Sequence, residues 1–280
     1  MFESHFGFSA PPFQLSPDPR FYFESKGHAQ ALSYLKYGVY QREGFIVVTG
    51  DIGSGKTTLV RTLLEGLDPK EVAAAQITNT QLDSNDLLQA ICTGFGVPLP
   101  ASGAGAVSKA QMLATLEAFF VALAAGGRRA LLIVDEAQNL GFKEIEELRM
   151  LSNFQLGHQA LLQSFLVGQP ELRAMLRSSP MEQLRQRVIA SCHLGPLTVD
   201  ETRAYIEHRL RRVGWTSRPS IAPAVFADIH AHSGGIPRRI NVLCTRVLLA
   251  VSLDGRDEIG PLDVSNAAAE LGAETGWAAH

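Results

Sequence analysis

The chain has 280 residues, of which 46% are hydrophobic, and its formal net charge at pH 7 is −3. This length allows one large domain or a main domain with a smaller one, and the slightly acidic balance gives no sign of a strongly basic surface that would point to nucleic acid, which leaves a local basic patch open. The three cysteines, Cys92, Cys192 and Cys244, are far apart and odd in number, so they fit neither a disulfide framework nor a metal motif and indicate a reducing compartment.

No targeting or membrane segment is expected in this sequence. The first residues lack a basic region followed by an apolar one, and no apolar run approaches the ~20 residues that span a bilayer. We therefore expect a cytoplasmic protein, which can still reach the inner membrane through a partner.

Residues 1–22 are rich in phenylalanine and proline. Because proline limits regular structure, we expect an arm here whose aromatic side chains dock onto the main domain and cover apolar surface. The alternative is that residues 15–19 pack near the base of a bound nucleotide. The next segment, 26–42, has apolar residues at helix spacing and predicts a helix.

A glycine-rich segment follows an apolar run at 45–48 and precedes a helical pattern that begins at Thr58. Backbone N–H groups of such a loop form an anion cradle at the positive end of the helix. Lys56 can reach the β- and γ-phosphates of a nucleotide, and the hydroxyl of Thr57 can bind Mg²⁺. A chance match should occur in roughly one in a hundred chains of this length, and the strand–loop–helix context favours a phosphate loop over an ordinary glycine turn. The predicted nucleotide-binding residues are Gly50, Asp51, Ile52, Gly53, Ser54, Gly55, Lys56, Thr57 and Thr58.

Weaker signals fill the region between the phosphate loop and the next apolar run. Residues 73–77 predict a second strand, and Ser84 is expected to cap a helix that ends near 94–96. Residues 98–105 are rich in proline, glycine and alanine and are interpreted as a loop, whereas 107–125 predict another helix.

A continuous apolar run at 130–134 ends in two carboxylates, Asp135 and Glu136. Such a run is typical of a buried parallel strand, and ligands of open α/β sheets lie beyond the carboxyl ends of the strands. Asp135 is therefore expected to hold Mg²⁺, directly or through water, and Glu136 to orient or deprotonate an attacking water. Alone the pair could equally be two solvated acids, but the phosphate loop ~80 residues upstream favours the functional interpretation.

The next elements continue the alternation of helices and strands. A helix is expected over 143–154, and a buried strand over 160–169 that ends at Gln169. Gln169 would then lie at the same sheet edge, within reach of a γ-phosphate or the water, or it would instead cap the helix that begins at Pro170. A short helix with two arginines over 180–188 and a final strand over 192–194 complete a predicted parallel sheet covered on both faces.

The strand signal disappears after residue 198. Thr198 and Glu201 have the spacing of a capping box, and helices are expected over 199–213, 222–233, 236–253 and 261–271. We therefore divide the chain into an α/β domain at 1–197, which includes the arm, and an all-α domain at 198–280.

The motifs GDIGSGKT, LLIVDEAQN, FLVGQPEL, LRQRV and GGIPRRIN occur in the order found in AAA+ ATPases, which this sequence resembles over nearly its whole length. It is most similar to the ExeA-like branch, related to the general secretion pathway A protein, and within it to the ATPases of exosortase (PEP-CTERM) and exopolysaccharide systems. The resemblance implies a P-loop AAA+ α/β/α domain of three layers with a central parallel sheet, followed by a small all-α lid.

The resemblance also implies roles for individual residues. Lys56 and Thr57 match the Walker A lysine and magnesium ligand, and Asp135 and Glu136 match the Walker B pair. Gln169 falls at the sensor-1 position, where asparagine or threonine is commoner.

Arginines complete the implied site. Arg187, with Arg185 as second choice, falls where the arginine finger lies, which serves the nucleotide of the neighbouring subunit. Arg238 matches the sensor-2 arginine of the lid, and Arg239 could substitute for it.

These motifs predict an ATPase that binds ATP or ADP with Mg²⁺, assembles as a homo-oligomeric ring or arc, and serves a protein partner in a secretion or exopolysaccharide system. The alternative is a nucleotide-gated switch with slow hydrolysis that acts on DNA or a protein, as transposition ATPases of related sequence do; the acidic charge speaks mildly against DNA. A kinase or other transferase is disfavoured by Glu136, the arginine pair and the lid.

Overall fold

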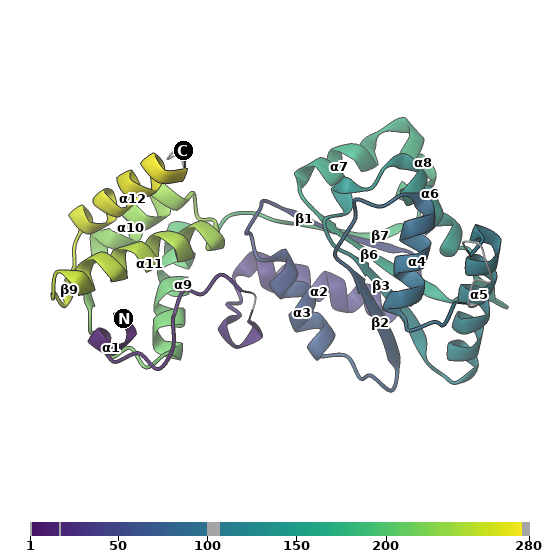
Figure 1. Ribbon diagram of the computed structural model, residues 1–280, viewed down its shortest axis with the longest axis horizontal. Helices are drawn as coiled ribbons and strands as arrows, with labels where there is room; N and C mark the ends of the chain where they lie inside the picture. Colours follow the sequence, from purple (N-terminus) through teal and green to yellow (C-terminus); the bar gives the residue numbers. More distant parts are fainter. Residues whose placement is uncertain (1, 17, 100–106, 276–280) are drawn as a thin grey trace. The chain divides into compact units, whose positions relative to one another are not determined.

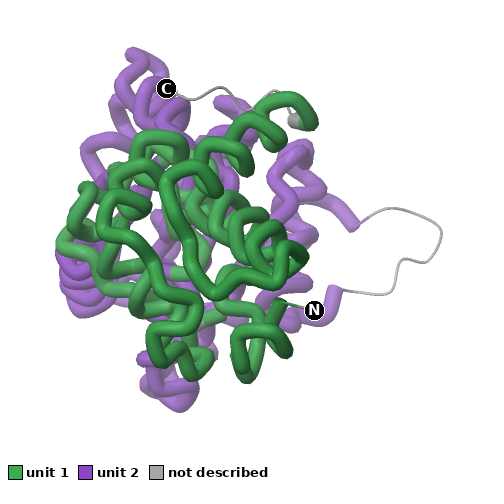
Figure 2. The backbone as a smooth tube through the Cα atoms, turned by 90° about the vertical axis from the view of Figure 1, so that its left-hand side faces the viewer, with its two compact units in different colours: residues 1–27, 51–58, 195–280 green, residues 28–50, 59–194 purple. Residues whose placement is uncertain are grey.

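The computed structural model describes residues 2–16, 18–99 and 107–275 (Figure 1). The chain forms two compact units, and each is assembled from segments that are distant in sequence (Figure 2). Residues 28–50 and 59–194 form one of them, here called the sheet unit. Residues 1–27, 51–58 and 195–280 form the other, here called the helical unit.

The centre of the sheet unit is a five-stranded, wholly parallel sheet. Its strands are β1 (Phe45–Gly50), β2 (Val72–Ile77), β3 (Arg129–Val134), β6 (Leu162–Gly168) and β7 (Val188–Leu194). They lie in the order β2-β3-β6-β1-β7. Every residue of β1 and β6 is buried, as expected for strands covered on both faces. The predicted parallel sheet is confirmed.

Helices cover both faces of this sheet (Figure 1). They are α2 (Lys26–Gln41), α3 (Lys56–Glu65), α4 (Ser84–Gly94), α5 (Lys109–Ala125), α6 (Phe142–Leu151), α7 (Pro170–Arg177) and α8 (Glu182–Arg185). Side chains of a strand alternate between faces, so Phe45 and Val47 join one core with α4, α5 and α6. Ile46 points to the other face and meets α2, where a Cβ on Gly38 would lie 1.8 Å from the Ile46 Cδ1. Three layers, α/β/α, result.

The helical unit contains the predicted run of helices near the C-terminus. They are α9 (Val199–Arg212), α10 (Pro223–Ser233), α11 (Pro237–Leu253) and α12 (Pro261–Thr275). Thr198 and Glu201 form the predicted capping box at the start of α9. Two short parallel strands, β8 (Ser220–Ile221) and β9 (Glu258–Ile259), pair within this unit and were not predicted.

The N-terminal arm packs into the helical unit, and the expectation that it docks onto the main α/β domain is wrong. It contains a short helix, α1 (Phe2–Phe6), and a 3-10 turn, η1 (Pro19–Phe21). Four of its phenylalanines are buried in one core with α9, α10, α11 and α12: Phe6, Phe8, Phe13 and Phe21. The aromatic composition correctly indicated burial, but it carries no information on which surface receives the rings.

Arg209 of α9 ties the arm to this core although it is only 6% exposed. Its Nε donates to the Pro12 carbonyl at 2.7 Å, and its Nη1 donates to the Tyr205 hydroxyl at 2.7 Å. The guanidinium carbon also lies 4.9 Å from the centre of the Phe21 ring. A buried cation is thus satisfied by backbone and hydroxyl oxygens and by an aromatic face.

Several element boundaries differ from the predictions. Asp83, not Ser84, caps α4, because its side chain accepts from two backbone N–H groups of the first turn. The helix α8 ends at Arg185, so Arg187 lies outside it, just before a β7 that begins four residues earlier than predicted. A hairpin of β4 (Gln155–Leu156) and β5 (Gln159–Ala160) was missed. Most of the loop expected at 98–105 lies outside the described residues.

Two adjacent glycines before α11 have similar backbone conformations but differ in the space around them. Gly234 and Gly235 both have positive φ, 62° and 69°. A Cβ on Gly234 would meet nothing within 4 Å, whereas one on Gly235 would lie 2.2 Å from the Leu197 carbonyl oxygen. We expect Gly234→Ala to lower the free energy of unfolding by about 1 kcal/mol and Gly235→Ala by roughly 3 kcal/mol, because only the second must move backbone. Urea unfolding of both variants measures the difference, and equal losses would contradict it.

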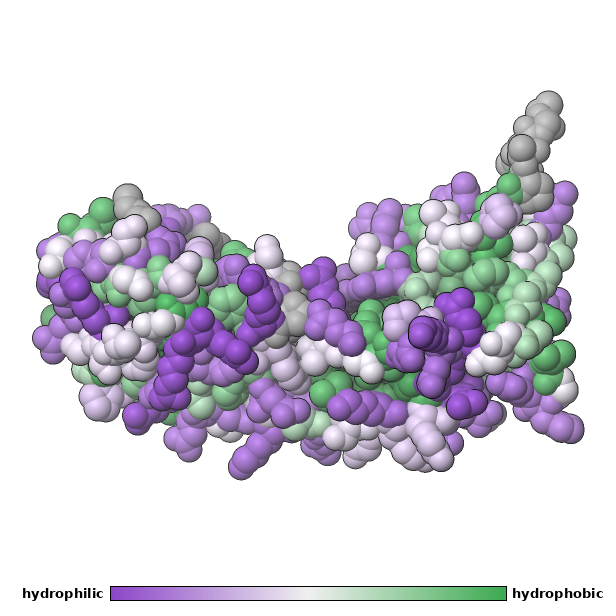
Figure 3. Space-filling view, turned by 90° about the horizontal axis from the view of Figure 1, so that it is seen from below, coloured by the Kyte–Doolittle hydropathy of each residue, from purple (hydrophilic) through white to green (hydrophobic). Residues whose placement is uncertain are grey.

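In the part of the chain that the structure describes, no helix is both long and apolar enough to cross a bilayer. On the face seen in Figure 3, hydrophobic residues are interspersed with hydrophilic ones.

Candidate functional site

The predicted phosphate loop follows β1 directly and leads into α3. Gly53 and Gly55 have φ of 82° and 100°, values that side chains rarely adopt. Ser54 N donates to the Asp51 carbonyl at 3.1 Å, which closes the turn. The helix begins at Lys56, so the loop delivers its backbone to a helix N-terminus, as an anion cradle requires.

Lys56 is folded back over this loop and is only 6% exposed. Its Nζ donates to the Asp51 carbonyl oxygen at 3.0 Å. The ammonium group is therefore held at the loop, where it would meet phosphate oxygens.

Arg238, the predicted sensor-2 residue, lies against the same loop within the helical unit. It is the second residue of α11, and its backbone N donates to the Gly53 carbonyl at 3.2 Å. A Cβ on Gly53 would lie 2.3 Å from the Arg238 Cβ, so only glycine permits this approach. The side chain of Arg238 is exposed, whereas that of Arg239 is half-buried. The structure thus brings together two motifs that are 185 positions apart, from residue 53 to residue 238.

In the sheet unit, the carboxyl ends of three neighbouring strands carry the other predicted residues. Asp135 follows β3, Gln169 follows β6, and Gly50 ends β1. Asp135 is 8% exposed, and its Oδ1 accepts from the Glu136 backbone N at 3.0 Å. The expected edge of the sheet therefore collects these residues, as the parallel topology requires.

Glu136 has a left-handed backbone conformation, with φ of 51° and ψ of 39°. Such a conformation is costly for a residue other than glycine and needs support from its surroundings. The Thr80 hydroxyl supplies it by donating to the Glu136 carbonyl at 2.9 Å. Thr80 is buried beyond the carboxyl end of β2, a position that sequence analysis did not single out.

Two glutamine amides hold the Glu136 carboxylate. Gln169 Nε2 donates to Glu136 Oε2 at 3.0 Å, and Gln138 Nε2 donates to the same oxygen at 2.5 Å. Gln169 is the N-cap residue of α7, but its side chain makes no capping hydrogen bond. The Gln169 side chain therefore contacts Glu136 and does not cap α7, and its predicted reach to a γ-phosphate or an attacking water stays a prediction. Gln138 was missed, and its only sequence signal was a polar residue directly after the acid pair.

The two finger candidates lie at the opposite edge of the sheet. Phe45 N, at the start of β1, donates to the Arg187 carbonyl at 2.9 Å. The Arg187 guanidinium donates to the Ser152 hydroxyl at 2.9 Å, whereas the exposed Arg185 donates to the Arg177 carbonyl at 3.2 Å. Neither arginine is near the Asp135 edge of its own sheet.

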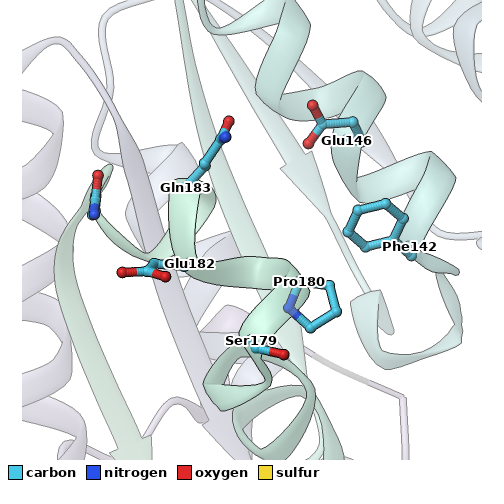
Figure 4. Close-up of a pocket in the computed structure, with 7 residues that line it drawn as sticks. Phe142, Glu146, Ser179, Pro180, Glu182 and Gln183 are labelled. Carbon is cyan, nitrogen blue, oxygen red and sulfur yellow. The ribbon is translucent and has the colours of Figure 1, made fainter.

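A cavity of about 350 Å³ adjoins the segment that carries these arginines (Figure 4). Its lining residues are Phe142, Glu146, Ser179, Pro180, Glu182, Gln183 and Gln186. The Arg149 guanidinium donates to Glu146 and lowers the pKa of that carboxyl, and the charge of Arg187 adds to the effect. None of the predicted site residues is among the described residues that line this cavity.

Strand order, a glycine-rich loop after β1 and a carboxylate pair after β3 together define a P-loop protein with the AAA fold. A family model described as "AAA domain" matches residues 39–176. The general secretion pathway protein A of Aeromonas hydrophila is 40% identical over 271 residues, which are 97% of this chain and 48% of that protein. The chain therefore spans about half the length of this curated relative. The similarity agrees with the predicted ExeA-like branch, and the narrower placement among exosortase-associated ATPases stays a prediction.

Solved structures share the fold at low sequence identity. The ORC2 protein of Aeropyrum pernix, solved in ADPNP-ADP complexes, matches with a TM-score of 0.66 and 19% identity over 94% of this chain and 72% of that chain. The RuvB Holliday junction branch migration motor of Thermotoga maritima matches with a TM-score of 0.58 and 20% identity over 89% of this chain and 70% of that chain. These matches confirm the predicted fold class, a parallel α/β/α domain followed by a helical region.

Proposed function

We propose that this protein is an Mg²⁺-dependent ATPase that hydrolyses ATP to ADP and phosphate. One observation carries the proposal: Glu136 lies just beyond the carboxyl end of β3, with its carboxylate held by the Gln169 amide at 3.0 Å. β6 alone separates β3 from β1, the strand that runs into the phosphate loop. A carboxylate in a buried ion pair would not need to lie at the end of a strand with its orientation fixed by an amide. A general base does, because it must face the reacting water.

The chemistry of the donors at the phosphate loop and after β3 fits a nucleotide with its metal ion. Gly53 and Gly55 adopt the positive φ that lets backbone N–H groups approach phosphate, and Lys56 adds a held positive charge. The Thr57 hydroxyl and the Asp135 carboxylate are hard oxygen donors, the kind that Mg²⁺ prefers. When bound, Mg²⁺ would neutralise charge on the β- and γ-phosphate oxygens.

In hydrolysis, Glu136 would accept the proton of the attacking water. The oxygen of water forms a bond to the γ-phosphorus, the bond from that phosphorus to the β–γ bridging oxygen breaks, and the proton of the water passes to the carboxylate. The chain's other residues bind and orient the substrate: Lys56 meets the phosphates, and Arg238 would sense the γ-phosphate from the lid.

The position of Arg187 supports an assembly of several subunits. β1 runs from Phe45, whose N–H contacts the Arg187 carbonyl, to Gly50 before the phosphate loop, a span of roughly 16 Å. Arg187 precedes β7 and Glu136 follows β3, so the two lie at opposite ends of the parallel strands of one sheet, and a finger at Arg187 would serve a neighbouring copy. We propose a homo-oligomeric ring or arc on this ground.

The client proposed for this ATPase is a protein of a secretion or exopolysaccharide system at the inner membrane. The support is the 40% identity to a general secretion pathway protein over nearly the whole chain. Because the match covers 48% of that relative, the partner is inferred from the shared half alone.

Phosphate release from Mg²⁺-ATP tests the proposal, with EDTA as the metal-free condition. Glu136→Gln should lower turnover by roughly 10²-fold or more while a fluorescent ATP analogue still binds, because only the proton acceptor is lost. Glu117→Gln, an exposed acid on α5, is the matched control and should keep wild-type turnover. If the wild type binds ATP without measurable hydrolysis, the result would instead favour the nucleotide-gated switch. A gel shift at low salt would then show whether this switch binds DNA.

A further inference from the structure

Gln138 joins the two residues on which hydrolysis depends. It belongs to the 3-10 turn η2 (Ala137–Asn139) that follows the acid pair. Its Nε2 donates to Glu136 Oε2 at 2.5 Å, and its Oε1 accepts from the Gln169 backbone N at 3.0 Å. Gln169 Nε2 donates to the same Glu136 oxygen at 3.0 Å. The three residues therefore form a closed ring of hydrogen bonds, to which Gln169 contributes both its side-chain amide and its backbone N–H.

This ring fixes which end of each amide faces the carboxylate. A backbone N–H can only donate, so the group of Gln138 that faces Gln169 must be its carbonyl oxygen. The NH₂ group of Gln138 is then directed at Glu136, which accepts. If the Gln138 amide were rotated by half a turn, its NH₂ group would face the Gln169 N–H, which is also a donor. Its oxygen would face the Glu136 carboxylate, which is also an acceptor.

The packing around the ring leaves room for this one side chain. A Cβ on Gly168, the last residue of β6, would lie 2.6 Å from Gln138 Oε1 and 2.9 Å from Leu172 Cδ2. A side chain at this position would therefore displace the Gln138 amide from the Gln169 backbone. The contact between Gln138 and the Gln169 backbone therefore depends on glycine at position 168.

We propose that Gln138 is a positioning residue for hydrolysis: it aims the Glu136 carboxylate and couples it to Gln169 at the end of β6. The proposal rests on the proposed ATPase function. A carboxylate on a flexible side chain must be held in one orientation to act on a positioned water, and a fork of two amides on one oxygen does this. It also means that any shift of Gln169 would be transmitted to Glu136 through two hydrogen bonds.

Two substitutions of Gln138 separate positioning from packing. Gln138→Met keeps the length of the side chain and removes both hydrogen bonds. Gln138→Glu keeps the acceptor for the Gln169 N–H, removes the donor to Glu136 and places a second carboxylate beside it. Both variants should lower kcat by roughly 10- to 100-fold with little change in KM for ATP, because binding relies on other residues. Lys143→Ala, which changes an exposed residue in the first turn of α6, should leave both constants at wild-type values.

The coupling to Gln169 is tested with a double variant. If the ring acts as a unit, Gln138→Met and Gln169→Met together should lower kcat about as much as either alone, whereas independent residues would multiply their effects. Unchanged kcat in both Gln138 variants, or losses that multiply, would overturn the proposal. If wild type hydrolyses ATP and Glu136→Gln does not, such a result would count against Gln138 alone, and an inactive wild type would instead count against the ATPase function.

Discussion

Lys56→Ala should reduce ATP turnover by roughly 10²- to 10³-fold or more and weaken nucleotide binding as well. The side chain is held at the loop by its bond to the Asp51 carbonyl, so it is positioned before any phosphate arrives. Its loss removes the loop's positive charge and also one of the contacts that shape the loop. Both turnover and affinity should therefore fall, in contrast to Glu136→Gln, which should spare binding.

Phosphate release and titration with a fluorescent ATP analogue measure the two effects. Lys70→Ala changes an exposed lysine between α3 and β2 and should behave as wild type. Full turnover by Lys56→Ala would exclude the phosphate loop as the catalytic nucleotide site. A loss of turnover with unchanged affinity would leave the site in place and assign Lys56 to the transition state alone.

Arg187→Ala should reduce turnover by roughly 10³-fold, the scale of a trans-acting arginine finger, while ATP binding persists. Wild-type activity per subunit should rise with protein concentration, since each site needs a neighbour. Arg185→Ala is measured in parallel, because Arg185 is the more exposed of the two and its guanidinium donates to the Arg177 carbonyl. Arg173→Ala, an exposed residue on α7, is the matched control.

Mixing two inactive variants tests whether the finger acts between subunits. In an equal mixture of Arg187→Ala and Glu136→Gln, roughly a quarter of the interfaces should pair an intact Glu136 with an intact Arg187 from the neighbour. Turnover should therefore reappear on mixing. No recovery, together with activity that does not depend on concentration, would contradict the shared site and favour a monomeric switch.

The parts of the fold that could be predicted from the sequence are those that depend on short, local sequence patterns. The apolar runs that became β1, β3 and β6 are buried on both faces, which leaves few other structures open to them. The phosphate loop has a fixed spacing, and the carboxylate pair ends a strand, so both could be placed at one sheet edge before the structure was known. The capping box at Thr198 is equally local, and it was correctly predicted.

The parts that could not be predicted depend on contacts between distant segments. Gln138 acquires its contact with Gln169 only when η2 and the end of β6 lie side by side, 31 residues apart in the chain. Gln169 could be a helix cap or a residue that reaches the γ-phosphate or the attacking water, and the sequence fits both because either use needs a polar residue before Pro170. The destination of the arm was equally open, since buried phenylalanine side chains have no preference between two apolar surfaces.

The arm that carries Phe6, Phe8 and Phe13 is a structural component of the helical unit rather than a tail. An expression fragment that begins at residue 195 would lack these rings and would leave Arg209 without the Pro12 carbonyl that it contacts. Such a fragment should be poorly soluble when produced alone and should be rescued by a synthetic peptide of residues 1–27 added separately. The affinity of the peptide for the fragment would then measure how strongly residues 1–27 bind to the core formed by helices α9 to α12.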